Sequence, residues 1–221
     1  EQGKGVGCTP TPNRFYLGDP LTNGTGFRPE TVKVPLLVGT VFSEFFGFMN
    51  GSGTPVSEVL GKEAAEKLLS LFRAAYPGRA DGDLLTLDTL FRVPTIAYIK
   101  ARAAVGGDVY SYLFQQDFPI NGRTTAWHCA DIPFFFHNAE LVPACHFDGA
   151  AALEERIFQA VMRFARSGEP GWPASTPEEE RTLLFGPEDR LAVNHDHELV
   201  ESLEPLMEQL MARMKDTQVQ H

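Results

Sequence analysis

Two residues of this sequence could act together in proton transfer: His128 has the chemistry of a general base, and Glu44 that of the acid that orients it. Glu44 stands four residues after Thr40, at the end of an apolar run, and His128 lies in the stretch TTAWHCADIPFFFHN. A carboxylate that accepts the Nδ1 proton of an imidazole leaves Nε2 to act as the base. On residue type alone, such a histidine is more often a packed core side chain, and such a glutamate a solvated loop acid. The two form a relay only if the fold brings them together.

The segments that precede these two residues have the patterns of strands. Residues 32–40, VKVPLLVGT, are a short apolar run bounded by turn residues, which predicts a strand buried on both faces. Residues 108–118, DVYSYLFQQDF, have an alternating pattern and contain β-branched and aromatic side chains, which predicts a second strand. Because sites in open α/β sheets form at the carboxyl ends of the strands, Glu44 and His128 are expected over one edge.

Helical periodicity fills much of the remaining chain. Helical regions are predicted over residues 57–76 and over 83–104, the latter with a restart at Pro94. A third helix is predicted to end at Gly168, and a fourth covers 203–214. Two short strands about a Gly-Pro turn are predicted within 182–194, and residues 1–31 form a long loop with an extended piece near 14–17. The pattern favours an α/β fold with a largely parallel sheet. Two core strands and a hairpin make a thin sheet for so many helices, so something is expected to be missing on one side.

Composition limits the classes of molecule that the chain is expected to bind. The chain has 19 basic and 29 acidic residues, a net charge of -10 and no Lys/Arg cluster, which argues against nucleic acid and anionic membranes. A small neutral or cationic substrate fits better, and no apolar run approaches the roughly 20 residues of a membrane span. Three cysteines without a C-x-x-C spacing predict reduced thiols and neither a disulfide framework nor a zinc site, and no cofactor is predicted. A cytoplasmic location is slightly favoured over a secreted one.

Five segments in order give the chain a family resemblance. The sequence resembles the type B carboxylesterases, the α/β-hydrolase family that also holds the cholinesterases. The segments that carry the resemblance are RFYLGDP, VPLLVGTVFSEF, AWHCADIPFFFHN, FARSGEPGWP and TLLFGPEDRLAV. The resemblance implies ester hydrolysis, with Glu44 as the acid of a catalytic triad and His128 as its general base.

The chain departs from the family pattern at the nucleophile. The G-x-S-x-G elbow is expected upstream of Glu44, whereas the run GSGTP at 51–55 lies downstream and lacks that spacing; the Gly-rich oxyanion loop is missing too. Residues 1–221 are therefore expected to be the C-terminal part of one α/β-hydrolase domain, with an acid loop near 41–48 and a histidine loop near 119–138. Its expected partners are a small ester and an N-terminal segment that carries the serine and the oxyanion loop. Alone, the chain is expected to be nearly inert.

Aromatic residues near the two loops are candidates for a substrate pocket. Phe45, Phe134 and Phe135 are predicted to contact an acyl or alcohol group, with core packing as the more common fate of such a run. Asp131, three residues from His128, competes with Glu44 as the acid, although a structural hydrogen bond is expected for it. Ser43 either hydrogen-bonds near the acid or is solvated.

Two further features are given structural interpretations. The run His195-Asp196-His197 looks like a set of metal ligands, but nothing is spaced to complete a tetrahedron, so a solvated polar turn is expected. Cys129, next to the proposed base, is expected to point away from it and is not predicted to be a nucleophile.

Two other functions stay open at this point. The first is a non-catalytic relative, because the family includes adhesion proteins that keep the fold and lose the triad, although retention of both Glu44 and His128 argues against this. Alternatively, the 221 residues form a complete, independent binding module, which requires that they fold without further strands.

Overall fold

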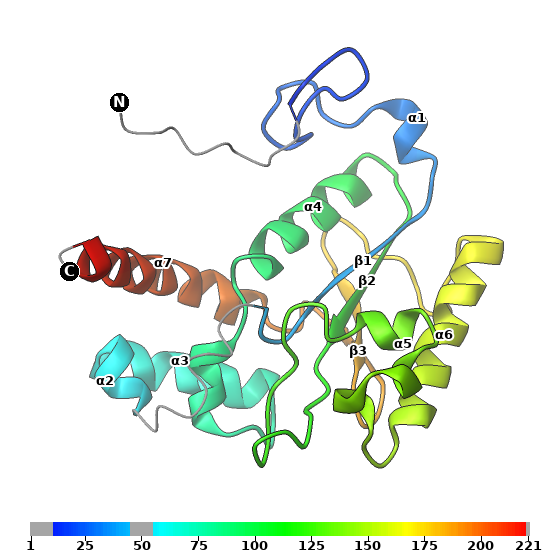
Figure 1. Cartoon of the computed structure of the whole chain (residues 1–221). Coiled ribbons are helices and arrows are strands. Elements are labelled where there is room, and N and C mark those ends of the chain that lie inside the picture. Colours follow the sequence, from blue (N-terminus) through cyan, green and yellow to red (C-terminus); the bar gives the residue numbers. More distant parts are fainter. Residues whose placement is uncertain (1–10, 45–54, 220–221) are drawn as a thin grey trace.

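A four-stranded mixed sheet forms the centre of the computed structural model, which describes residues 11–44 and 55–219 (Figure 1). The strands are β1 (Leu36–Val41), β2 (Val109–Phe114), β3 (Arg181–Phe185) and β4 (Arg190–Val193), and they lie side by side in that order. The first three run parallel, and β4 pairs with β3 in the antiparallel direction. The predicted α/β fold, its largely parallel sheet and its terminal hairpin are confirmed.

Helices occupy most of the chain between and after the strands. The α-helices are α1 (Pro29–Val32), α2 (Val56–Leu60), α3 (Lys62–Ala75), α4 (Arg92–Ala104), α5 (Ile132–Phe135), α6 (Ala150–Ser167) and α7 (His197–Val219). Short 3-10 helices are η2 (Asp81–Thr86), η3 (Ala139–Leu141) and η4 (Pro143–Cys145). The predicted helical regions are largely confirmed. Gly61 at φ 84° divides the first of them into α2 and α3, and residues 87–91 interrupt the second, which restarts at Arg92 instead of Pro94. Among the described residues, no helix is both long enough and apolar enough to cross a bilayer.

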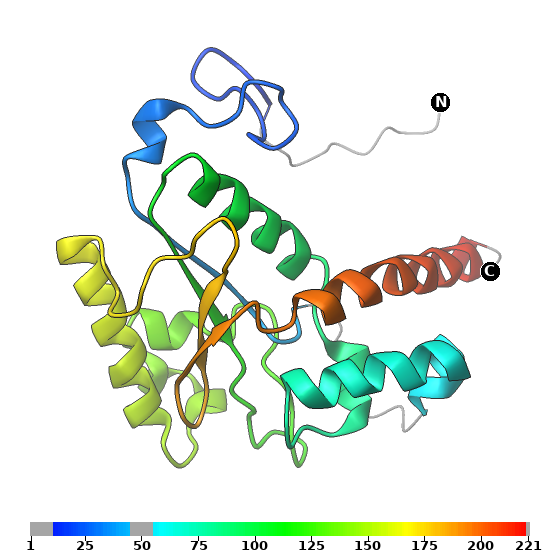
Figure 2. The ribbon, with the colours of Figure 1, turned by 180° about the vertical axis from the view of Figure 1, so that it is seen from behind.

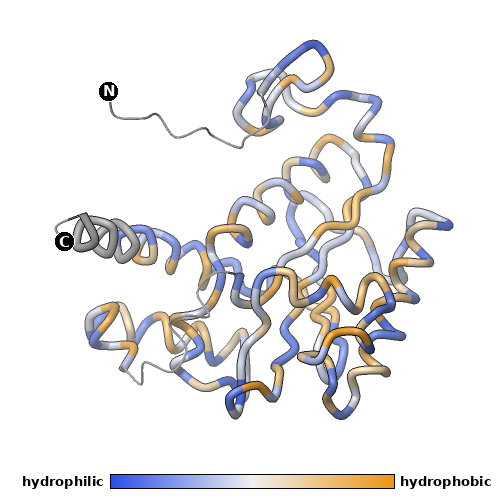
Figure 3. Tube along the Cα trace, in the orientation of Figure 1, coloured by the Kyte–Doolittle hydropathy of each residue, from blue (hydrophilic) through white to orange (hydrophobic). Residues whose placement is uncertain are grey.

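The alternation of side chains along β2 assigns the helices to the two faces of the sheet. Tyr110 packs against Phe164 of α6, and Phe114 packs against Phe134 of α5, at centroid distances of 6.1 Å and 5.4 Å. Ser111, between them, points to the other face, which α4 covers. Figures 1 and 2 show α4 and α6 on different sides of the strands. Apolar residues run along the strands, while polar and apolar residues alternate on the peripheral helices (Figure 3).

Strand β1 lies at an edge of the described sheet. Its neighbour is β2, with Leu36 opposite Val109 and Val41 opposite Phe114. Residues 36–39 are half-buried, so the prediction of a strand buried on both faces is correct for the end of β1 and wrong for its beginning. An apolar parallel strand with one unpaired edge is a surface on which a further strand can pair.

Two predictions about irregular segments are wrong. The extended piece near residues 14–17 is a turn, in which the Asn13 amide donates to the carbonyl of Tyr16 and the Asn13 side chain accepts from the Phe15 amide. The stretch Pro-Phe-Phe-Phe, expected in a loop, contributes to α5, because Pro133 suits the first turn of a helix. Any feature at residues 1–10 and 45–54 lies outside the described residues.

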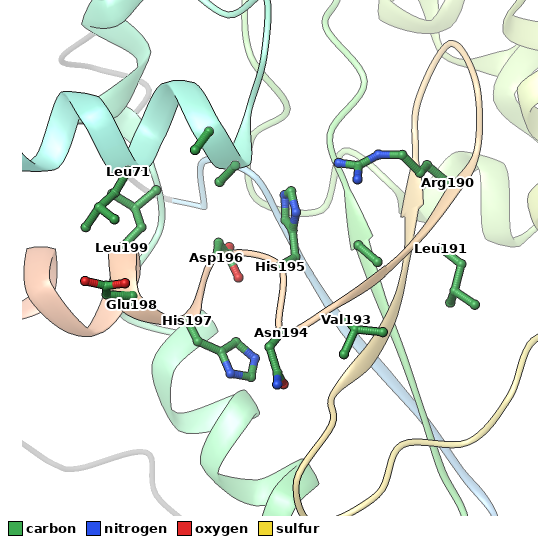
Figure 4. Close-up of a pocket in the computed structure, with 13 residues that line it drawn as sticks. Leu71, Arg190, Leu191, Val193, Asn194, His195, Asp196, His197, Glu198 and Leu199 are labelled. Atoms are coloured by element: carbon green, nitrogen blue, oxygen red, sulfur yellow. The ribbon is translucent and has the colours of Figure 1, made fainter.

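The run His195-Asp196-His197 is part of a buried ionic network, so the prediction of a solvated polar turn is wrong. The Arg92 guanidinium, 1% exposed, contacts Glu180 and Asp196, each at 2.7 Å. His197 Nε2 lies 2.6 Å from the same Glu180 carboxylate. Buried charges are tolerated when they are paired and hydrogen-bonded, which explains how so polar a run enters the interior. A polar pocket of about 520 Å³ lies between α3, β4 and the start of α7, and His195 and His197 are among the residues that line it. Figure 4 shows their side chains pointing in opposite directions.

The network sets the protonation of its two acids. Burial alone would raise the pKa of both carboxyls, but the charge and the hydrogen bonds of Arg92 outweigh it, and the pKa of Asp196 and that of Glu180 lie below their usual values. Because their folded-state pKa values are depressed, the stabilisation from these acids is present at neutral pH. It is lost as the pH falls below the pKa that they have in the unfolded chain, near 4.

Removal of the central cation is expected to destabilise the chain strongly. Arg92→Met leaves Glu180 and Asp196 buried without their partner, and we expect the free energy of unfolding to fall by about 3–5 kcal/mol. Chemical denaturation followed by circular dichroism measures the change. Arg73→Met is the matched control, because Arg73 pairs with Asp81 at the surface, and it should leave the unfolding midpoint nearly unchanged. Equal effects of the two substitutions would contradict a role for the network in stability.

Candidate functional site

The carboxylate of Glu44 is fixed by the turn that ends β1. The Phe42 amide donates to the carbonyl of Phe114 at 2.9 Å, so the chain stays paired with β2 for one residue beyond the strand. It then turns, and Glu44 Oε1 accepts the amide of Val41 at 3.1 Å. The side chain of Glu44 is 9% exposed. A carboxylate in this position has one oxygen held by the backbone and the other left to face a neighbour.

Two backbone hydrogen bonds join this turn to the histidine loop. The Ser43 amide donates to the carbonyl of Ala126 at 3.1 Å, and the His128 amide donates to the carbonyl of Glu44 at 3.0 Å. Directly after His128 the chain reverses through Cys129, whose φ of 67° is uncommon for a residue other than glycine. Residues held in such a conformation are frequent at functional turns, because the surrounding structure must support the strain.

The side chains of Glu44 and His128 meet across this junction. Glu44 Oε2 lies 2.6 Å from His128 Nδ1, the distance of a strong hydrogen bond between an imidazole and a carboxylate. The His128 side chain is 48% exposed, and its ring lies against that of Phe91 with centroids 6.0 Å apart and planes 20° apart. The predicted contact between the two residues is therefore present, while their catalytic role stays a prediction.

Asp131 has the structural role that was expected for it. The Tyr112 hydroxyl donates to Asp131 Oδ2 at 2.9 Å. Burial raises the pKa of Asp131, and the negative charge of Glu44 adds to the rise, while the hydroxyl of Tyr112 opposes it. A Cβ at Gly39, on the neighbouring strand β1, would overlap Tyr112, so only glycine leaves room for this ring. In this way β1 and β2 together support the loop that follows His128.

The three phenylalanines predicted to line a substrate pocket have different environments. Phe134 is fully buried and packs against Phe114, Phe118 and Phe147, which is the alternative of core packing. Phe135 is partly buried and packs against Tyr112 and Phe185. Phe45 lies outside the described residues. A role in substrate binding stays a prediction for Phe135 and conflicts with the burial of Phe134.

Two residues near the pair were not correctly identified from the sequence. Ser43 is fully buried, so it is not solvated, and its hydroxyl has no hydrogen-bond partner within the described part of the chain. Asp88, next to the turn of Glu44, is 1% exposed and was not singled out. The signal available for Asp88 was its place before Leu90 and Phe91, where an aspartate commonly caps a helix. No group of three potential ligands that could hold a metal ion occurs in residues 11–44 and 55–219.

Removal of the Tyr112 hydroxyl is expected to change the titration of Asp131. In Tyr112→Phe the buried carboxylate loses the donor that favours its charged form, so the pKa of Asp131 should rise further. Carbon-detected NMR of the aspartate carboxyl groups measures the shift. Tyr98→Phe is the control, because Tyr98, in the middle of α4, packs against Phe27 and not against Asp131. An unchanged titration of Asp131 in Tyr112→Phe would rule out this hydrogen bond in solution.

The burial of Phe134 predicts a stability effect that distinguishes it from its neighbour. Phe134→Ala removes a fully buried ring and should lower the free energy of unfolding by about 3–5 kcal/mol. Phe136 is 72% exposed, so Phe136→Ala should change that free energy by less than about 0.5 kcal/mol. Chemical denaturation compares the two variants, and a small effect of Phe134→Ala would show that the ring is not part of the core.

Solved structures with similar folds are esterases. An esterase from Clostridium hathewayi, described as able to hydrolyse aliphatic aromatic polyesters, matches 90% of this chain with 40% identity and a TM-score of 0.80. A PNB esterase matches 76% of the chain with 26% identity and a TM-score of 0.54. A carboxylesterase from Geobacillus stearothermophilus matches 76% with 22% identity and a TM-score of 0.55, which is evidence for the fold alone.

This chain spans less than half of each of these proteins. It covers 42% of the Clostridium chain, 38% of the PNB esterase and 40% of the Geobacillus enzyme. No protein-family model matches the sequence. The likeness therefore concerns one part of a larger esterase.

Proposed function

The chain has the α/β-hydrolase fold of the carboxylesterases and resembles their C-terminal portion, and we propose that it supplies the acid and the base of a serine esterase. The observation that carries the proposal is the 2.6 Å contact between Glu44 Oε2 and His128 Nδ1. Glu44 holds the imidazole in one orientation and stabilises its protonated form, and His128 Nε2 transfers the proton.

The reaction needs a serine and oxyanion donors from outside these 221 residues. His128 takes the proton of that serine hydroxyl while its oxygen attacks the ester carbonyl, and the resulting imidazolium then protonates the departing alcohol. The acyl group stays on the serine until His128 takes a proton from water, whose oxygen attacks the acyl carbonyl. The imidazolium then returns this proton to the departing serine oxygen, and the carboxylic acid is released. The chain alone is therefore proposed to be inactive.

The residues described here form one part of a single domain in this proposal. Strand β1 has an apolar, half-buried edge, where a further parallel strand can pair. The segment that carries the serine is proposed to dock there, because the acid turn directly follows this strand. The length of the matched esterases leaves more than half of their chains for such a segment.

The proposed substrate class is small carboxylic esters. The exposed ring of Phe91, 39% accessible, lies against His128 and gives this side of the pair an apolar character. Because the Clostridium relative is described as acting on aliphatic aromatic polyesters, esters of aromatic acids are the first compounds to test. A net charge of -10 favours neutral over anionic esters.

The experiment is an ester-hydrolysis assay of the complete protein, or of this chain mixed with the upstream segment. His128→Ala and Glu44→Gln should each lower kcat about 10⁴-fold, since the base or its orientation is lost. His146→Ala is the matched control, because this exposed histidine bonds the carbonyl of Glu140 and should leave the activity unchanged. Full activity of His128→Ala would overturn the proposed function.

A further inference from the structure

Asp88 ties the turn that leads into α4 to the end of β1. Its carboxylate accepts the amides of Leu90, Phe91 and Arg92 at 3.2, 3.1 and 2.9 Å, so it closes the beginning of the helix. Its own amide donates to the carbonyl of Phe42 at 2.9 Å. One buried residue therefore connects α4 to the turn that carries Glu44.

This connection reaches the imidazole through a neighbour in the same turn. Phe91, whose amide Asp88 holds, lies with its ring nearly parallel to that of His128 at a centroid distance of 6.0 Å. The imidazole thus has Glu44 at its Nδ1 edge and Phe91 beside its face. Because a ring contact limits tilting and a hydrogen bond limits rotation, both are needed to fix the direction of Nε2.

The burial of Asp88 is costly for the fold. Glu180 and Asp196 share the cation of Arg92. By contrast, the Asp88 carboxylate accepts hydrogen bonds from backbone amides within the described residues. Burial raises the pKa of Asp88 to about 6, and the negative charge of Glu44 adds to the rise. Above that pH the ionised side chain therefore lowers stability. Such a cost is more typical of functional sites than of structural caps.

We propose that Asp88 is a positioning residue for the Glu44–His128 pair, which fixes the turn leading into α4 so that Phe91 holds the imidazole in its working orientation. The inference rests on the proposed function. It predicts an effect on the turnover step, because the orientation of Nε2 matters when the proton moves, and a small effect on substrate binding.

Asp88→Asn in the complete protein is the main test. The amide keeps one acceptor oxygen, but it turns a donor toward one of the three backbone amides, which loosens the turn. We expect kcat for a chromogenic ester to fall about tenfold while KM stays within about twofold. The unfolding midpoint at pH 7 should be equal to or higher than that of the parent, because the ionised carboxylate with the raised pKa is gone.

Asp19→Asn is the matched control. Asp19 also accepts a backbone amide, that of Leu21, but it lies in the exposed loop before α1 and away from the site. The same chemical change there should leave kcat, KM and the unfolding midpoint unchanged. Equal kcat values for Asp88→Asn and the parent would overturn the proposal, as would a fall in kcat that merely follows a loss of folded protein.

A second measurement does not depend on esterase activity. The ring protons of His128, assigned by NMR with His128→Ala, should shift upfield in the parent because they lie against Phe91. In Asp88→Asn they should move toward their positions in Phe91→Ala, and Asp88→Ser, which offers a shorter capping oxygen, serves if Asp88→Asn does not fold. Unmoved resonances in a folded variant would overturn the positioning role. If they move but His128→Ala retains full activity, the proposed function fails while the positioning of the ring stands.

Discussion

The parallel pairing of β1 with β2 is the constraint on which the candidate site depends. It places the carboxyl ends of both strands at one edge, and the register that sets Val41 opposite Phe114 makes the strands end together. The turn after β1 and the loop after β2 then exchange backbone hydrogen bonds before any side chain is considered. The contact between Glu44 and His128 follows from this arrangement, because residues 84 positions apart are delivered to the same place by main-chain geometry. A shift of the register by one residue would reverse the faces of the alternating side chains and separate the pair.

Much of this arrangement could be predicted from the sequence, and the failures have identifiable causes. Strands and helices of regular period were found because burial imposes that period, and the pairing of Glu44 with His128 followed from where two strands end. The polar run at His195 to His197 was misjudged because its partner Arg92 is about a hundred residues away, and composition does not show that a buried cation neutralises it. The half-burial of β1 was missed for a related reason. An apolar run predicts that a strand is covered on both faces, but it does not show which residues cover it. The burial of Phe134 and the exposure of Phe136 could not be predicted from the string Pro-Phe-Phe-Phe, since a helical turn directs one ring inward and the other outward.

Four acids of this protein, Asp88, Asp131, Glu180 and Asp196, fall into two groups with opposite electrostatics. Glu180 and Asp196 share the Arg92 guanidinium, so their charged forms are favoured and their pKa values are depressed. Asp88 and Asp131 are held by amide or hydroxyl donors near Glu44, and burial raises the pKa of each. Raised values gather where the imidazole is, which is the distribution expected if the surrounding field serves chemistry and not stability.

The beginning of α4 connects these two groups. Arg92 points to the ionic network on the inner face of the sheet, while Asp88, four residues earlier, closes the same turn toward Glu44. The network therefore has a consequence beyond stability: it holds the start of α4, and the residue directly before this helix is Phe91, whose ring lies against His128. A rigid support of this kind is what a proton-transfer site requires, because the side chain of His128 is half exposed and its orientation must still be fixed. The stabilising charges are thus placed next to Asp88, a buried acid that accepts backbone amides and whose burial is costly.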